Sequence, residues 1–407
     1  MKNRMVKQKR LWVGILAVAL AVLLVLTACA PPATPLLEEG KIVEIGSLCG
    51  LTGGAAGPTQ FYLQGMLDYV RYFNEEKGIP GVTIKLVWID VAAQVPRFIS
   101  GYYGLAGRGV PFIHGEEARA LEGLRLRLET DQIAFIGSGM TGALIYPPGW
   151  VFSTWALQAE EASAVFDYFM ENWKEERPPR LQFAMIDIPW GWEILEGTKY
   201  AESIGFEVLP AEPCPYVVID AIPQLLRIRE READLVYVQH IVPGAGPILR
   251  DAERLGLQDV MQFAGSKEAM GEVLIATAPA GVEGFLSARS LPWFDETEIP
   301  GIRTMVDMQQ RYRGKVERRA EYMHGWACGA IMCEAIKGAL EEVAYENLDG
   351  AAVKKALERM DFDLDGMARF TYGPEDRRGT RDYAVYQVQG GKIVPASDWR
   401  EVPILVP

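Results

Sequence analysis

The chain is 407 residues long and acidic, with 41 Lys or Arg against 54 Asp or Glu and a formal net charge of −13. The first 28 residues hold five Lys or Arg and no acid, so the remainder carries −18, which is −13 less 5. Such an acidic chain is a poor partner for nucleic acid or anionic lipid surfaces, and its length indicates two domains of ordinary size.

Residues 1–40 have the pattern of a targeting segment followed by a tether. Basic residues over 2–10 precede an apolar run over 11–28, as in a secretory signal peptide. A permanent membrane anchor is the alternative, because this run is near the minimum length that crosses a bilayer. The stretch "LTAC", ending at Cys29, resembles a bacterial lipobox, which would make 1–28 a lipoprotein signal peptide and Cys29 the lipidated first residue. Residues 29–40 would then be a proline-rich linker, and the protein would be extracytoplasmic and lipid-anchored to the cell membrane, in the periplasm or at the outer cell surface.

From residue 41 onward, short β-rich runs alternate with amphipathic helical stretches. Strands are expected at 41–48, 83–90, 110–115 and 132–139, and helices at 58–77, 96–107 and 116–129. This alternation predicts a parallel sheet covered by helices on both faces.

The alternation restarts after residue 154. Helices are expected at 158–173, 191–204, 221–231, 245–256 and 268–276, and strands at 181–188, 206–212, 234–240 and 260–266. Residues 282–290 lead into helices at 299–313, 319–345 and 350–360, and a β-rich stretch over 368–394 closes the chain. The sequence therefore predicts an α/β protein with two Rossmann-like lobes.

Motifs for metal, cofactor or catalysis do not occur in the sequence. It contains no CxxC, GxSxG, GxGxxG, GK[ST] or HExxH motif, so we expect no metal, no cofactor and no enzymatic activity. Cys328 and Cys333 fall five apart in one predicted helix, where their side chains diverge. Cys49 and Cys214 follow separate strands, and a disulfide between them is possible.

Several stretches in order along the chain resemble one family. Residues 45–90, "IGSLCGLTGGAAGPTQFYLQGMLDYVRYFNEEKGIPGVTIKLVWID", resemble the first βαβ unit of periplasmic binding proteins of the branched-chain amino acid type. "SGMTGALIYPPGWVFST", "DIPWGWEILEG" and "ILRDAERLGLQDVMQFAGS" resemble later parts of the same family. The similarity runs over about 41–400.

This resemblance implies the periplasmic binding protein type I fold, in which three crossover strands join two lobes around a ligand cleft. We expect lobe I to comprise 41–154 plus 286–365, and lobe II 155–285 plus 366–403. The implied function is capture of a small solute by hinge closure and its delivery to the permease and ATPase subunits of an ABC importer, by a monomer. A sensory receptor of the same fold is the alternative function.

In lobe I the family holds the ligand carboxylate with a loop that matches Gly139, Met140 and Thr141. Gly139 and Thr141 are the expected donors, and a tight turn in which Thr141 only caps the next segment is the alternative. The loop after the third strand, with Glu117 and Ala118, lacks the hydroxyls common in the family. It would attract a cation or simply begin a helix.

Ala56 replaces a residue that is often bulky in amino-acid binders, which leaves room for a larger ligand. In lobe II, Trp190 falls where the family commonly has a Tyr that lies on the ligand. Trp155 is expected either to form a second side of the ligand pocket or to be a core residue.

Lys267 aligns with a Glu that pairs with the ammonium of amino-acid ligands, and Glu268 follows it. If Lys267 faces the cleft, an anionic ligand gains a partner; if Glu268 does, the amino-acid interpretation stands. An aromatic or other carboxylate, an amide or a urea-like compound is therefore the alternative to a branched-chain amino acid. Three further residues are expected near the cleft: Gln239, His240 and Tyr322.

Overall fold

The computed structural model describes residues 40–53 and 56–405. The predicted signal peptide, Cys29 and nearly all of the predicted linker lie outside the described residues. Within the described part of the chain, no helix is both long and apolar enough to cross a membrane.

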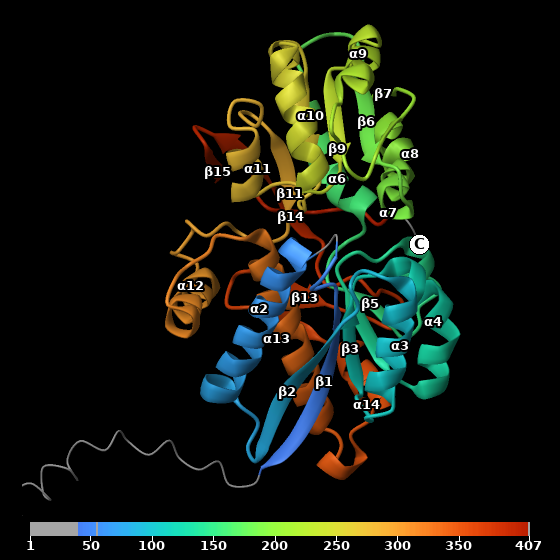
Figure 1. Ribbon diagram of the computed structural model, residues 1–407, viewed down its shortest axis with the longest axis vertical. Helices are drawn as coiled ribbons and strands as arrows, with labels where there is room; N and C mark the ends of the chain where they lie inside the picture. The colour runs from blue at the N-terminus through green and yellow to red at the C-terminus, as the bar shows by residue number, and fades with distance from the viewer. Residues whose placement is uncertain (1–39, 54–55, 406–407) are drawn as a thin grey trace, which may run out of the picture. The chain divides into compact units, whose positions relative to one another are not determined.

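The first sheet is five-stranded, in the order β2-β1-β3-β4-β5 (Figure 1). Every residue of the short strands β3 and β4 is buried, as expected for parallel strands covered on both faces. Its strands are β1 (Lys41–Cys49), β2 (Val82–Asp90), β3 (Phe112–Gly115), β4 (Ala134–Gly137) and β5 (Val151–Ser153). Its helices are α2 (Ala56–Tyr72), α3 (Val95–Ala106), α4 (Ala118–Asp131), α5 (Gly142–Ile145), α12 (Pro300–Arg313), α13 (Ala320–Leu340) and α14 (Gly350–Leu357).

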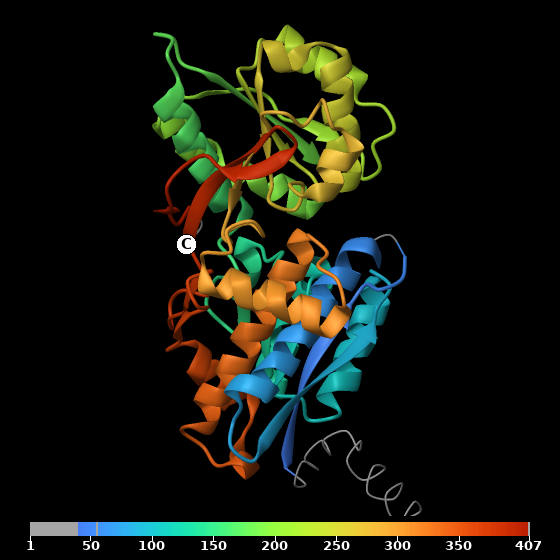
Figure 2. The same cartoon turned by 90° about the vertical axis from the view of Figure 1, so that its left-hand side faces the viewer.

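The second sheet has nine strands, with β15-β14-β11-β10-β9-β6-β7 as its main path (Figure 2). Strands β6, β9, β10 and β11 run parallel, whereas β14 is antiparallel to β11. The strands are β6 (Arg180–Ile186), β7 (Glu207–Val208), β8 (Glu212–Cys214), β9 (Leu235–Gln239), β10 (Gln262–Gly265), β11 (Leu286–Arg289), β14 (Asp382–Gln389), β15 (Lys392–Pro395) and β16 (Arg400–Glu401). The main helices with this sheet are α6 (Gln158–Asn172), α8 (Thr198–Ser203), α9 (Ile222–Glu230), α10 (Val242–Arg254) and α11 (Glu272–Thr277).

The two-lobed α/β fold predicted from the sequence is confirmed, with local differences. The helix expected at 191–204 is divided into α7 (Pro189–Trp192), a 3₁₀ turn at Glu193–Gly197 and α8. The helix expected at 58–77 ends as α2 at Tyr72 and continues as a π-helical turn, Phe73–Lys77. The prediction assigned residues 286–365 to lobe I. In the structure, β11 pairs with β10 and β14, so Leu286–Arg289 belong to the second sheet.

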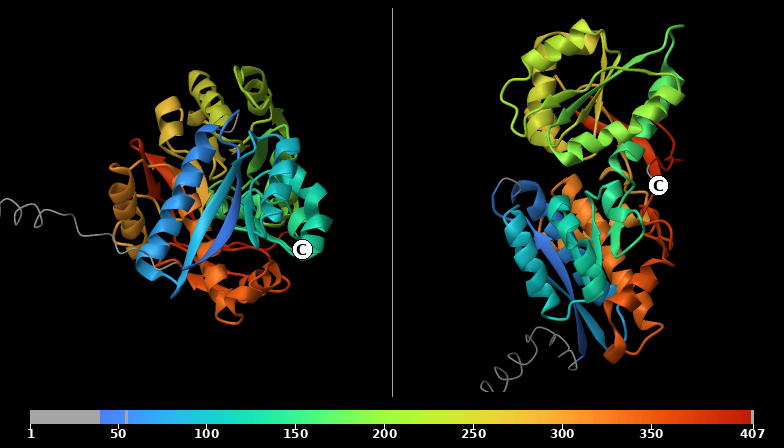
Figure 3. Two further views of the ribbon diagram at one scale, coloured as in Figure 1. Left: turned by 60° about the horizontal axis from the view of Figure 1, so that its bottom comes forward. Right: turned by 90° about the vertical axis from the view of Figure 1, so that its right-hand side faces the viewer.

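Glycines bring α2 and α13 into close contact along the first sheet, where Figures 1 and 3 show the two helices side by side. A Cβ at Gly65 would lie 2.1 Å from the carbonyl oxygen of Tyr322, and one at Gly325 would lie 1.9 Å from that of Tyr62. Neither position can hold a larger residue without moving a helix backbone. This contact fixes Tyr62 beside the carboxyl ends of β1 and β3.

Three segments connect the two sheets: 154–157 after β5, 290–299 after β11, and 372–381 before β14. The third segment is bonded to the end of β5, because Ser153 N donates to the carbonyl oxygen of Arg377 at 2.8 Å. The Arg378 guanidinium also donates two hydrogen bonds to Glu160, of 2.7 and 2.8 Å, at the start of α6. Both side chains are buried, so this ion pair joins the third connecting segment to α6 inside the protein.

The four described cysteines, Cys49, Cys214, Cys328 and Cys333, are buried and free. The possible disulfide between Cys49 and Cys214 is therefore absent. No group of three or more His, Cys, Asp or Glu side chains in the described ranges could hold a metal ion.

Candidate functional site

The strongest candidate site lies where loops at the carboxyl ends of the parallel strands contact each other. In open α/β sheets this is the edge at which ligands bind. Gly142 N, in the loop region after β4, donates a 3.2 Å hydrogen bond to Glu193 Oε1, just beyond β6. A Cβ at Gly139 would lie 3.9 Å from Trp190 Cδ1. The ligand loops predicted in the two halves of the chain therefore contact each other.

The loop after β4 presents one unused polar group. Thr141 Oγ1 is buried without a hydrogen-bond partner, and the side chain makes no capping bond to α5. Its neighbour Ser138 is fixed by a 2.8 Å hydrogen bond to the hydroxyl of Tyr62, whose ring stacks on His114. Met140 instead points into the hydrophobic core and is 1% exposed.

The loop after β3 is an ordinary helix start. Glu117 precedes α4 and forms a 2.9 Å ion pair with Arg119, which is itself largely exposed. Ala118 is the first residue of α4 and is half-buried. Ala56 is the first residue of α2, and its side chain lies outside the described part of the structure.

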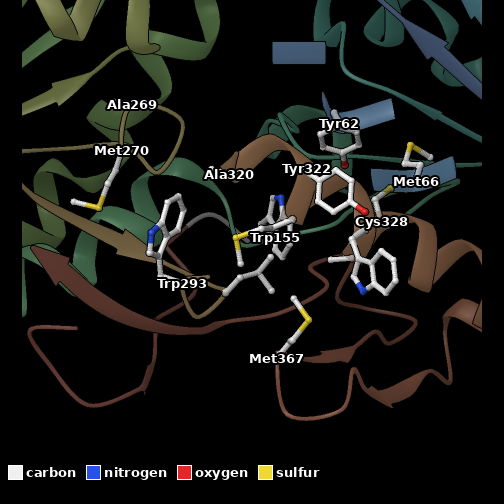
Figure 4. Close-up of a cluster of buried hydrophobic side chains, with 14 of the residues drawn as sticks. Tyr62, Met66, Trp155, Ala269, Met270, Trp293, Ala320, Tyr322, Cys328 and Met367 are labelled. Atoms are coloured by element: carbon white, nitrogen blue, oxygen red, sulfur yellow. The ribbon is translucent and has the colours of Figure 1, made fainter. Parts of the chain in front are cut away.

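The two predicted tryptophans differ in environment. Trp190 is half-buried, on the loop that contacts Gly139. Trp155 is fully buried and packs against His324 and Phe370, with ring centroids 5.2 and 5.9 Å away. It belongs to the hydrophobic cluster drawn in Figure 4, although its indole Nε1 has no hydrogen-bond partner.

Lys267 is an ion-paired core residue rather than a cation presented to a ligand. Its ammonium group contacts Glu161 and, at 3.0 Å, Glu268 Oε1, and its side chain is completely buried. The Tyr383 hydroxyl donates a second hydrogen bond, of 2.8 Å, to Glu161. Burial raises the pKa of Glu161 to about 7, and the nearby Lys267 opposes that shift. Glu268 Oε2 is buried without a hydrogen-bond partner. Of Lys267 and Glu268, it is therefore Glu268 that has a polar atom available for a ligand.

Three other predicted site residues are held by the protein itself. Tyr322 donates a 2.9 Å hydrogen bond to Asp68, and His240 Nε2 lies 3.1 Å from the carbonyl oxygen of Pro215. Gln239 Nε2 donates to Gln158 Oε1 at 3.2 Å, which leaves only Oε1 of Gln239 unused. All three are buried and already bonded within the protein: Gln239 and His240 lie at the packed end of β9, and Tyr322 lies in α13.

Three residues with buried polar groups were not identified from the sequence: Glu193, which bonds Gly142, and the neighbouring pair Arg289 and Trp293. Burial raises the pKa of Glu193 to about 8 and lowers that of Arg289 to about 10. The guanidinium of Arg289 lies 4.5 Å from the ring centroid of Trp293. An Arg that ends an otherwise buried strand, as in "FLSARS", was the available signal for this pair.

Ser47, His114 and Glu116 have the residue types of a hydrolytic triad, but Ser47 and His114 are buried. Ser47 Oγ lies 2.9 Å from His114 Nδ1, and His114 Nε2 lies 3.7 Å from Glu116 Oε1. However, the Ser47 side chain is 0% exposed and also contacts Cys49 Sγ at 3.0 Å. Ser47 and His114 therefore satisfy each other inside the protein, as a polar core contact between β1 and β3.

A model of the family described as periplasmic binding protein matches residues 42–392, most of the chain. The chain belongs to the periplasmic binding protein family. It is therefore a solute-binding protein of an extracytoplasmic family, and the resemblance seen in the sequence is confirmed.

Solved structures share the fold of this periplasmic binding protein. A branched-chain amino acid ABC transporter protein from Thermus thermophilus with bound valine is 22% identical, with a TM-score of 0.82 over 90% of this chain and 98% of that one. A fatty acid ABC transporter substrate-binding protein from Thermomonospora curvata is 21% identical, with a TM-score of 0.78 over 90% and 95%.

A solute-binding protein of an ABC transporter from Rhodopseudomonas palustris, in complex with 3,4-dihydroxybenzoic acid, is 16% identical, with a TM-score of 0.74 over 89% and 98%. No curated protein sequence matches the chain. The identities are low, so these structures establish the fold of the periplasmic binding protein and not its ligand.

Proposed function

We propose that this protein captures a small carboxylate-bearing solute, an amino acid or a related compound, and delivers it to the permease of an ABC importer. The observation that carries the proposal is the set of buried polar atoms without partners in the binding-protein fold. It includes Thr141 Oγ1, Glu193 Oε2, Glu268 Oε2 and the three nitrogens of the Arg289 guanidinium. Buried polar groups are normally hydrogen-bonded, and a bound solute would satisfy these atoms.

The mechanism is closure of the two lobes around the solute. Ligand that contacts both lobes shifts the population toward the closed form, which presents both lobes to the permease. The bond between Gly142 N and Glu193 is a contact of the kind that closure makes. No chemical step is required, so the protein acts as a receptor and not as an enzyme.

The location of the protein follows from its N-terminal sequence. The lipobox-like "LTAC" supports acylation at Cys29 and attachment of a monomer to the outer face of a cell membrane. The acidic net charge of −13 supports a small-molecule ligand over nucleic acid.

A thermal-unfolding screen of the full-length chain in detergent tests the proposal, after unfolding and refolding to remove bound solute. The panel contains leucine, valine, phenylalanine, 3,4-dihydroxybenzoate, decanoate, acetamide and urea. A compound present at about 100 times its Kd stabilises the folded protein by roughly 2.7 kcal/mol, which gives a clear rise in Tm. We expect at least one carboxylate to raise Tm and to make the protein more compact in small-angle scattering. A panel without any stabilising compound would contradict the proposal.

A further inference from the structure

The last residue of β11 and the connecting segment after it carry three buried hydrogen-bond donor groups without partners. These are the guanidinium nitrogens of Arg289, the hydroxyl of Ser290 and the indole Nε1 of Trp293. Each of the three residues is at most 1% exposed. Arg and Trp side chains can only donate, so whatever satisfies them must be an acceptor.

An unpaired guanidinium in the protein interior is energetically unfavourable. Buried charges are normally paired, because the loss of hydration is offset only by a counter-ion and its hydrogen bonds. Other buried arginines of this chain follow the rule: Arg377 bonds Glu358, and Arg378 bonds Glu160. The guanidinium of Arg289 makes no hydrogen bond, and its Cζ lies 4.5 Å from the ring centroid of Trp293.

Arg289 shares its surroundings with Glu268, one of the predicted site residues. Tyr386 and Glu296, followed by Glu321 and Glu268, act electrostatically on the guanidinium and oppose the pKa decrease that burial causes. The positive charge of Arg289, with that of Lys267, in turn adds to the burial that lowers the pKa of His324. His324 packs on Trp155, so Arg289 and the two indoles belong to one region of the interior, and Figure 4 draws both indoles in one cluster.

The geometry of the pair favours a planar anion. The Cζ of Arg289 lies over the Trp293 ring, 4.5 Å from its centroid, and all three guanidinium nitrogens are free of hydrogen bonds. Two parallel N–H groups of Arg match the two oxygens of a carboxylate.

We propose that Arg289, with Ser290 and Trp293, is the receptor for the ligand's carboxylate group. This inference rests on the proposed function and deepens it, because it assigns the acid group of the solute to the connecting segment after β11. A ligand lacking a carboxylate would leave all three donors unsatisfied. The protein should therefore select for the acid group irrespective of whether an amine is also present.

The test compares matched ligands and variants of the full-length chain in detergent. The probes are L-phenylalanine, 3-phenylpropanoate, phenylalaninamide and phenethylamine, together with L-leucine and leucinamide, so that acid and amine are removed one at a time. The variants are Arg289→Gln, Arg289→Lys and, as a control buried arginine, Arg377→Gln. Isothermal titration gives Kd, and thermal unfolding without ligand gives Tm.

We expect only the carboxylates to bind the wild type, and Arg289→Gln to weaken them roughly a hundredfold. Arg289→Lys keeps the charge but loses the two parallel donors, so its Kd should lie between that of the wild type and that of Arg289→Gln. Arg377→Gln keeps the wild-type Kd. Without ligand, Arg289→Gln should have a higher Tm than the wild type, because an uncompensated buried charge has been removed.

Two results would overturn the inference. One is carboxylate binding to Arg289→Gln with the wild-type Kd, which would leave the proposed function intact. The other is a lower ligand-free Tm in Arg289→Gln, because that would make Arg289 the structural partner of Glu268 or Glu321. If no probe binds the wild type, the proposed function fails for these solutes, and the ligand-free Tm alone decides the role of Arg289.

Discussion

Trp190 is half-buried on the short helix after β6, and its indole lies beside Gly139 of the opposite loop. A tryptophan at such a position offers a large apolar face without belonging to the core of either sheet. Its neighbour Trp192 is more exposed and donates a hydrogen bond of 2.8 Å to Asp187. Trp192 is therefore a suitable control for Trp190, because the two tryptophans are neighbours with different exposure.

We predict that Trp190→Ala raises the Kd for the solute at least about thirtyfold while Tm without ligand changes little. In the proposed site the indole would cover the ligand, and it is only partly packed against the protein. Titration calorimetry on any solute found in the screen measures the change. Trp192→Ala serves as the matched control and should keep the wild-type Kd; equal effects of the two variants would place Trp190 outside the site.

Individual residues also mark how far sequence alone could predict the site. The loop 139–141 and Trp190 were assigned through the family resemblance, and the structure brings them together, because a Cβ at Gly139 would lie 3.9 Å from Trp190 Cδ1. Their role as ligand contacts stays a prediction. Lys267 was assigned by alignment to the ligand, but its ammonium is paired inside the protein with Glu161, a residue 106 positions away. Such a pairing depends on side-chain packing between distant segments, and no local pattern predicts it.

At the scale of elements, the strands and most helices were predictable because each is a hydrophobic run with clear ends. The connecting segments were not. Residues 372–381 form no helix or strand of their own, and their position is fixed by Arg378, which bonds Glu160 in α6. Glu160 Oε2 also accepts a hydrogen bond from Leu157 N. Glu160 therefore caps α6 and also connects segment 154–157 to segment 372–381.

We predict that Glu160→Gln lowers the free energy of unfolding by about 3–5 kcal/mol, because it leaves the buried Arg378 without its main counter-ion. Glu171→Gln, on the same helix, removes an exposed pair with Arg400 and should cost less than about 1 kcal/mol. Urea denaturation of both variants gives the comparison. Similar losses in the two variants would show that the Arg378 pair does not hold the connecting segments.

At the scale of the whole molecule, Glu193 makes the contact between the two halves depend on pH. Burial raises its pKa from 4.5 to about 8, and its Oε1 accepts a hydrogen bond from Gly142 N. A carboxyl whose pKa is higher in the folded state takes up a proton on folding. The stability it contributes is therefore complete below about pH 4.5 and is lost as pH rises toward 8.

We predict that the free energy of unfolding of the wild type falls, relative to Glu193→Gln, by at least about 1 kcal/mol between pH 5 and pH 8. The amide cannot ionise, so the variant lacks this contribution. Urea denaturation across the pH range measures the difference, and Glu196→Gln, at an exposed position of the same turn, should follow the wild type. Parallel pH curves for the wild type and Glu193→Gln would contradict the assignment.

The close contact of α2 and α13 has a consequence for how this protein can evolve. At Gly65 and Gly325 any side chain would meet helix backbone, so these positions tolerate no exchange without a change of the fold. Trp190, which we propose faces the solute, lies on the short helix α7 in the loop region after β6 and is half-buried. Substitutions that alter solute preference can therefore accumulate at that loop while the helix pair that supports the site stays the same, and one scaffold can serve a succession of different nutrients.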